Sequence, residues 1–296
     1  MRVTCSAVRK QTLLSLLALL AVFAVAPCKS QAAENLPSHS ASESLKIGLV
    51  PYSASSRAIA AWLPLANFLQ AELKKPVQVV TAPNHKVFFE RVLQGRYFLL
   101  LSSPHVAAAM IKRGQVYPVR LVTIPLTARL LVHKNSPFTN LKSLAGKSIS
   151  TTNVGAFTAL LLEQEIALLN KVQPFSMSIR YQSSHAAAIR SLLTGHTDAA
   201  YVSRLPHSKS SLEQFKQLKI LSYSSITSHP MVVSPTSLGV DHANMIGALL
   251  DQYADQEPLS TRSLQPFGGA PKYTFAPIRQ SDLDLLEPLF AHWRTQ

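Results

Sequence analysis

The feature that most constrains the fold is an alternation of short apolar segments and amphipathic segments that begins at residue 45. Residues 45–53 (LKIGLVPYS) have the composition of a buried strand. Residues 56–73 repeat apolar side chains at a spacing close to 3.6, as an amphipathic helix does. A strand at 76–82, a helix at 84–95 and a strand at 97–103 follow. Asn84 is the expected N-cap of this helix, and Gly95 is its expected stop. Strands that alternate with helices favour a mostly parallel sheet flanked by helices.

The alternation continues along the chain and predicts two lobes. The roughly 260 residues after position 32 are more than one such sheet usually holds. We therefore predict an α/β protein with a hinge of two crossover segments. Lobe 1 is expected to comprise 45–134 together with 230–296, and lobe 2 to comprise 135–229. The other predicted elements are strands at 119–126, 128–134, 176–182, 199–202, 218–224 and 229–235, and helices at 156–171, 239–254 and 281–294. A short helix followed by a strand is predicted within 140–152, and a helix that ends at Gly195 is predicted after Ser184.

Residues 1–32 resemble a secretory signal peptide. A basic start is followed by an apolar stretch at 12–26, which is shorter than a membrane-spanning helix requires. Small residues then permit cleavage after Ala32. A lipid anchor at Cys28 is the alternative, but Pro27 stands where lipidation needs a small residue. An uncleaved anchor would need a longer apolar stretch, so we expect a protein exported to the periplasm.

Cysteine usage and charge exclude several classes of function. Cys5 and Cys28 are the two cysteines, and both precede the expected cleavage site, so the mature chain would have no thiol nucleophile, thiolate metal site or disulfide. The formal net charge is +14, of which about +10 remains after cleavage. The basic residues are scattered, and export removes the usual nucleic-acid partner. A positive field that favours anionic ligands is the more modest interpretation.

Four short phrases occur in a fixed order along the chain. The phrases are IGLVP (47–51), WLPLANFL with KPV (62–69 and 75–77), LKSLAGK (141–147), and SHAAAI with GHTDAA (184–189 and 195–200). Together they resemble the phosphate/phosphite/phosphonate-type periplasmic substrate-binding proteins of ABC transporters, over about residues 45–235.

The resemblance implies a type II-like two-lobe binding protein. Such a protein captures a small anionic solute, here a phosphonate- or phosphite-like oxyanion, between its lobes by hinge closure. It delivers the solute to an inner-membrane ABC permease. We accordingly expect a monomer with no cofactor, no metal and no nucleic-acid partner.

The chain also departs from the family pattern near the expected ligand. Phe98 stands where the family usually has Asp, and Ala107 where it has Tyr. Ser103 replaces the Gly of a Gly-Pro pair, and residues 151–158 replace a loop rich in Ser, Thr and Gly. A family member with changed specificity is therefore an alternative.

The candidate ligand-binding residues lie where predicted strands end and helices begin. Free N–H groups and the helix dipole favour an anion at such positions. The family resemblance adds His185, and His105 holds the matching position in the first lobe. The candidates are Tyr52, Ser102, Ser103, His105, Thr151, Thr152, Asn153, Ser184, His185 and Tyr201.

Each candidate also has a purely structural interpretation. Ser103, Asn153 and Ser184 are suitable N-caps, and such a cap stabilises a helix by about 1 kcal/mol. His185 is equally compatible with a solvated histidine at the start of a helix. The two tyrosines are compatible with ordinary core packing.

Two other functions are alternatives to ligand transport. The chain has neither a G-x-S-x-G nor an H-E-x-x-H motif, so we expect no enzyme activity. The same fold could instead present its closed, ligand-bound form to a membrane receptor kinase. No feature within the chain separates this sensory role from transport.

Overall fold

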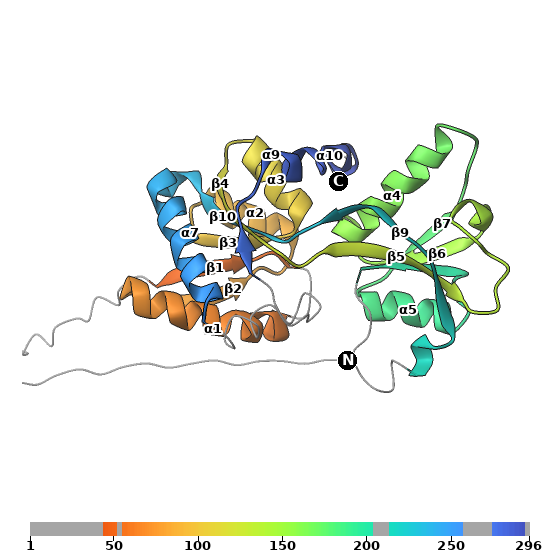
Figure 1. The fold of residues 1–296 in the computed structure, drawn as a ribbon, viewed down its shortest axis with the longest axis horizontal. Helices are drawn as coiled ribbons and strands as arrows, with labels where there is room; N and C mark the ends of the chain where they lie inside the picture. Colours follow the sequence, from red (N-terminus) through yellow and green to blue (C-terminus); the bar gives the residue numbers. More distant parts are fainter. Residues whose placement is uncertain (1–43, 52–54, 204–212, 257–273, 294–296) are drawn as a thin grey trace, which may run out of the picture. The chain divides into compact units, whose positions relative to one another are not determined.

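The computed structural model describes residues 44–51, 55–203, 213–256 and 274–293. The expected signal segment and Tyr52 lie outside these residues. The described chain forms two β-sheets flanked by helices (Figure 1), which confirms the predicted fold class. We call the first sheet with its helices lobe 1, and the second sheet with its helices lobe 2. None of the described helices combines the length and the apolar character needed to cross a membrane.

The sheet of lobe 1 has six strands in the order β11-β4-β10-β3-β1-β2. β1 pairs in parallel with both β2 and β3, whereas β10 runs antiparallel to β3 and β4. The strands are β1 (Leu45–Leu49), β2 (Val77–Thr81), β3 (Leu99–Ser102), β4 (Val116–Val122), β10 (Met231–Pro235) and β11 (Phe275–Ala276).

The sheet of lobe 2 has five strands in the order β7-β6-β8-β5-β9. β6 is parallel to β7 and β8, and β5 is antiparallel to β8 and β9. Both sheets are therefore mixed, with their parallel strands joined by helices. The strands are β5 (Leu126–His133), β6 (Ser148–Thr151), β7 (Ser178–Tyr181), β8 (Ala199–Val202) and β9 (Leu218–Ser228).

The helices cover the sheets as the apolar periodicity predicts. In α1, Trp62, Leu65 and Leu69 are buried, although Pro64 lies within the helix. Asn84 caps α2 by accepting a hydrogen bond from the Val87 amide at 2.9 Å, as predicted. The helices of lobe 1 are α1 (Ser55–Leu73), α2 (His85–Leu93), α3 (Pro104–Lys112), α7 (Val240–Ala254), α9 (Gln280–Asp284) and α10 (Glu287–Trp293), with a 3-10 turn η2 (Thr236–Leu238). Those of lobe 2 are α4 (Phe157–Asn170) and α5 (His185–Leu193), with a 3-10 turn η1 (Lys142–Leu144).

The chain passes between the two sheets at residues 123–125 and again at residues 229–230. Pro125 and Pro230 lie in these crossovers, where neither proline interrupts a central strand. The first crossover comes before β5, whereas the sequence places the break near residue 134. The apolar pattern misses this position because it runs from β4 into β5 with only Pro125 between them.

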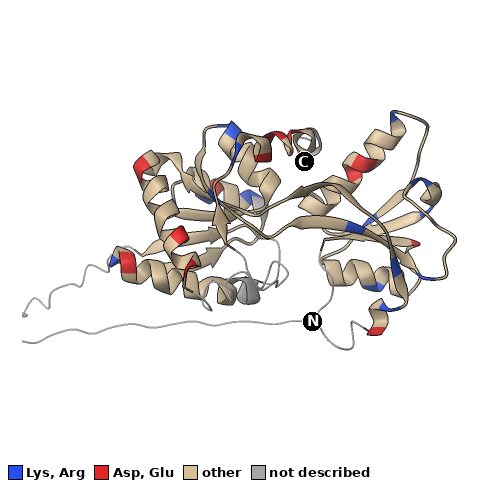
Figure 2. Ribbon diagram, viewed as in Figure 1, with Lys and Arg blue, Asp and Glu red and all other residues tan. Residues whose placement is uncertain are grey.

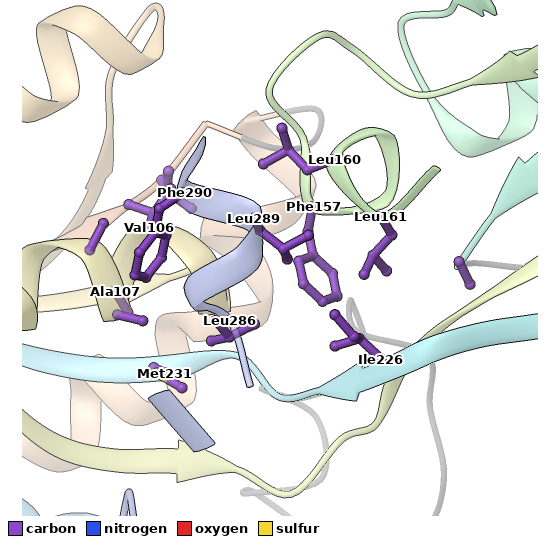
Figure 3. Packing of buried hydrophobic residues seen from close by; sticks show 14 of the residues in the cluster. Val106, Ala107, Phe157, Leu160, Leu161, Ile226, Met231, Leu286, Leu289 and Phe290 are labelled. Atoms are coloured by element: carbon purple, nitrogen blue, oxygen red, sulfur yellow. The ribbon is translucent and has the colours of Figure 1, made fainter. Parts of the chain in front are cut away.

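Among the residues that the structure describes, the apolar core consists of three clusters of side chains. One lies in lobe 1 under α1 and α7, and a smaller one lies in lobe 2 under α5. The largest contains residues of both sheets and of α10, which contacts both α3 and α4. Figure 3 shows Phe290 and Leu289 of α10 among Val106 of α3 and Leu160 of α4.

The last predicted helix, at 281–294, is divided into α9 and α10. Residues 285–286 separate the two helices, and Pro288 is the second residue of α10. Proline lacks an N–H donor and is tolerated in the first turn of a helix but not in its interior. The interruption places Leu286 and Leu289 in the core, where both are fully buried.

Candidate functional site

Each lobe has a buried hydroxyl group at the carboxyl end of one of its strands. Ser102 is the last residue of β3 and is 1% exposed, and Thr152, directly after β6, is 6% exposed. Within the described part of the chain, neither hydroxyl oxygen has a hydrogen-bond partner. A buried hydroxyl without a partner costs about 1–3 kcal/mol, so native proteins rarely keep one without a reason.

Helices begin shortly after the strand ends that carry these hydroxyl groups. α3 begins two residues after Ser102, and α4 begins five residues after Thr152. α5 begins where the chain turns back from β7. The first N–H groups of these helices have no partner within the helix, and the helix dipoles add positive potential there.

His105 connects α3 to the loop that precedes α4. Its Nε2 lies 3.1 Å from the Gly155 carbonyl oxygen, and because a carbonyl only accepts, Nε2 is the donor. The imidazole also stacks on the Phe157 ring, with centroids 5.8 Å apart and an angle of 15° between the planes. His105 is almost fully buried. Residues of the two lobes therefore meet at these two helix starts.

A chain of polar contacts joins the starts of α4 and α5 in lobe 2. The Thr158 hydroxyl donates to the Ser203 hydroxyl at 3.1 Å. The Ser203 hydroxyl lies 3.4 Å from Nε2 of His185. Arg129 fixes the same position from β5, because its Nη1 donates to the Ser203 carbonyl at 3.1 Å.

Thr158, Ser203 and Phe157 are not among the residues predicted from the sequence. Ser203 directly follows β8, and the other two residues lie in the first turn of α4. The rule that selected Ser102 and Thr152 applies to them equally, so position at a strand end or helix start could have identified them.

Three other candidates lie at the starts of helices. Ser184 caps α5, because its hydroxyl accepts a hydrogen bond from the Ala187 amide at 3.2 Å. Ser103 occupies the cap position of α3 without a capping bond from its side chain. Asn153 is exposed, and the cap residue of α4 is Ala156 instead. The backbone carbonyl of Asn153 accepts a hydrogen bond from the Ala156 amide at 3.0 Å.

Thr151 and Tyr201 use their hydroxyl groups inside lobe 2. Thr151 donates to the Tyr201 carbonyl at 2.9 Å, and the Tyr201 hydroxyl donates to Oε1 of Glu165 at 2.8 Å. The same carboxylate oxygen accepts from the Ser225 amide at 3.1 Å. Burial raises the pKa of Glu165, and the two hydrogen bonds oppose this rise. Tyr201, which is fully buried, thus fits the core interpretation by tying β8 to α4.

The described residues contain no cluster of three or more His, Cys, Asp or Glu side chains that could hold a metal ion. Figure 2 shows that the positions of basic and acidic residues along the ribbon are dispersed over the described elements rather than gathered on one of them. The arrangement at the strand ends consists of hydroxyl groups, imidazoles and helix N-termini. Chemically, such groups donate hydrogen bonds, and they suit the binding of an anion.

Comparison with solved structures identifies similar folds. XAC2383 from Xanthomonas citri bound to ATP superposes with a TM-score of 0.69 at 15% identity, covering 85% of this chain and 97% of that one. PhnD1 from Prochlorococcus marinus (MIT 9301) in complex with methylphosphonate gives 0.67 at 14% identity, covering 86% and 99%. The periplasmic aliphatic sulphonate-binding protein SsuA from Escherichia coli gives 0.63 at 15% identity, covering 86% and 92%.

Sequence comparison adds the family. No curated protein matches the chain. Residues 47–283, however, match the sequence model of the phosphonate periplasmic substrate-binding proteins of ABC transporters. This is a family of transport components rather than of enzymes, and it implies a solute ligand, a membrane permease and a periplasmic location. The chain belongs to the family of ABC-transporter phosphonate periplasmic substrate-binding proteins.

Proposed function

We propose that the protein captures a small oxyanion, of the phosphonate or phosphite kind, between its two lobes and delivers it to an inner-membrane ABC permease. The observation that carries the proposal is the pair of buried hydroxyl groups of Ser102 and Thr152. They lie at strand ends in different lobes, and an oxyanion held between the lobes would accept from both. Such a ligand would also offset the cost of burying them.

The mechanism that we propose is hinge closure about the two crossovers at residues 123–125 and 229–230. A ligand that contacts both lobes binds the closed form more tightly than the open form and shifts the population toward it. The permease would then recognise the closed form. Residues 1–32 would direct the chain to the periplasm as a signal peptide and be removed there.

The proposal is tested by isothermal titration of the protein, expressed from its full sequence, with phosphate, phosphite, methylphosphonate and sulfate. At least one oxyanion should bind. Ser102→Ala and Thr152→Val should each weaken that binding about tenfold or more, because a hydrogen bond to a charged group contributes about 1.5–3 kcal/mol.

A matched control is Thr194→Val. The Thr194 hydroxyl donates to the Arg190 carbonyl at the far end of α5, so its loss should leave affinity unchanged. The proposal is wrong if no oxyanion binds at millimolar concentration. It is also wrong if Ser102→Ala and Thr152→Val bind as the unaltered protein does.

A further inference from the structure

Lysines that are scattered in the sequence gather at one end of lobe 2. At this end β6, β7, β8 and β9 begin, and β5 ends because it runs antiparallel to β8 and β9. We call it the basic end. It lies opposite the strand ends that are followed by Thr152 and Ser203. Its lysines are Lys134, Lys142, Lys147, Lys171, Lys216 and Lys219.

Backbone hydrogen bonds hold the segments of the basic end together. Most of the lysines belong to residues 134–147, 171–177 and 213–217. The Lys134 amide donates to the Gln217 carbonyl at 2.8 Å and joins the first segment to the third. The Gly146 amide donates to the Ser176 carbonyl at 2.9 Å and joins the first segment to the second. The lysines therefore share one surface.

Carboxylates do not balance the positive charge of the basic end. Residues 134–147 and 171–177 contain no Asp or Glu. Glu213 forms an ion pair with Lys216, and two hydrogen bonds of 2.8 Å already engage Asp198. Among the residues that the structure describes, no carboxylate forms an ion pair with the exposed lysines Lys134, Lys142, Lys147 and Lys171.

Exposed apolar side chains lie beside these charges. Leu168 is 46% exposed and Val172 is 75% exposed, about one helical turn apart where α4 ends at Lys171. Apolar side chains of this size gain free energy when they leave water. Lysines with exposed apolar neighbours are typical of protein surfaces that bind the interface of an anionic bilayer.

We propose that the basic end of lobe 2 binds the surface of an anionic phospholipid bilayer, with Leu168 and Val172 reaching the boundary between head groups and acyl chains. A bilayer is favoured over an acidic protein, because a lipid surface is continuous, contacts all the segments at once and accepts apolar side chains between the charges. The family serves a membrane transporter, so such a surface is close by. Contact through the basic end leaves the opposite strand ends uncovered, and it does not depend on the identity of the ligand.

The test is co-sedimentation of the exported protein, expressed from its full sequence, with lipid vesicles. The protein should bind vesicles of phosphatidylcholine mixed with phosphatidylglycerol and should not bind vesicles of phosphatidylcholine alone. Lys142→Glu combined with Lys171→Glu should weaken binding at least about tenfold, because each lysine near an anionic surface strengthens binding about fivefold. Both lysines are exposed, so the variant should fold as the unaltered protein does.

Lys75→Glu combined with Arg96→Glu is the matched control. Both residues are exposed in lobe 1, just before β2 and β3, and the double substitution changes the net charge by the same amount. At an ionic strength of about 0.15 M, salt screens charges beyond about 8 Å, so this variant should bind as the unaltered protein does. Equal losses in the two double variants would mean that the overall charge attracts the vesicles, and the proposal would be wrong.

The apolar side chains separate a bilayer from any other negatively charged surface. Leu168→Ser combined with Val172→Ser keeps every charge and should weaken vesicle binding about fivefold, because less apolar area leaves water. Unchanged binding of this variant would show a purely electrostatic contact and would overturn the assignment to a bilayer. Failure of the unaltered protein to bind the phosphatidylglycerol vesicles would overturn the proposal outright, whether or not an oxyanion binds between the lobes.

Discussion

Thr151 and Thr152 are neighbours in the chain, and their hydroxyl groups are in opposite situations. Both side chains are buried, but Thr151 donates to the Tyr201 carbonyl, whereas Thr152 has no partner among the described residues. Both residues are predicted from the sequence for the same reason, their position at a strand end. The difference arises from the direction of each side chain relative to β8, which depends on strand order and not on local sequence.

Replacing each of the two threonines should have opposite effects on the free energy of unfolding of the ligand-free protein. Thr151→Val removes a buried hydrogen bond and should lower the free energy of unfolding by about 1 kcal/mol. Thr152→Val removes an unsatisfied hydroxyl and should leave that free energy unchanged or raise it by a similar amount. Urea unfolding of the ligand-free proteins measures both values. Equal destabilisation by the two variants would mean that Thr152 has a structural partner.

At the scale of elements, sequence periodicity predicted local structure well. The helix stops at Gly95 and Gly195 are confirmed, since both glycines have positive φ, at 65° and 73°. The periodicity could not predict contacts between distant elements. The stacking of His105 on Phe157 and the packing of α10 against α4 join segments that share no local pattern.

The helix α10 contributes to stability by packing against both lobes. Phe290 is 5% exposed within the cluster that Figure 3 shows, so Phe290→Ala should lower the free energy of unfolding by about 3 kcal/mol. Leu285→Ala is the control, because Leu285 is 42% exposed and should change stability by no more than about 0.5 kcal/mol. Urea denaturation compares the two variants. Similar effects would show that α10 is not held by this cluster.

At the scale of the whole molecule, hinge closure can be observed by fluorescence energy transfer. Both native cysteines lie within residues 1–32, so after cleavage dyes attach only to introduced cysteines. Glu72 of α1 and Arg190 of α5 are exposed residues of different lobes. Transfer between dyes at Glu72→Cys and Arg190→Cys should rise when ligand saturates the protein.

A pair of dyes within lobe 1, at Glu72→Cys and Glu90→Cys, is the control and should show constant transfer. If saturating ligand changed neither pair, binding would occur without closure, and a different signal would have to reach the permease.

The position of β10 also constrains the order in which the chain can fold. β10 lies between β3 and β4 in the first sheet, yet it follows the whole of the second sheet in the sequence. All five strands of the second sheet lie within residues 126–228, so that sheet can be complete before β10 has been synthesised. Until then β4 has no partner strand, and the β3 edge is open to intermolecular pairing. Completion of the first sheet thus depends on a contact of large sequence separation, which makes folding slow and leaves the nascent chain prone to aggregation.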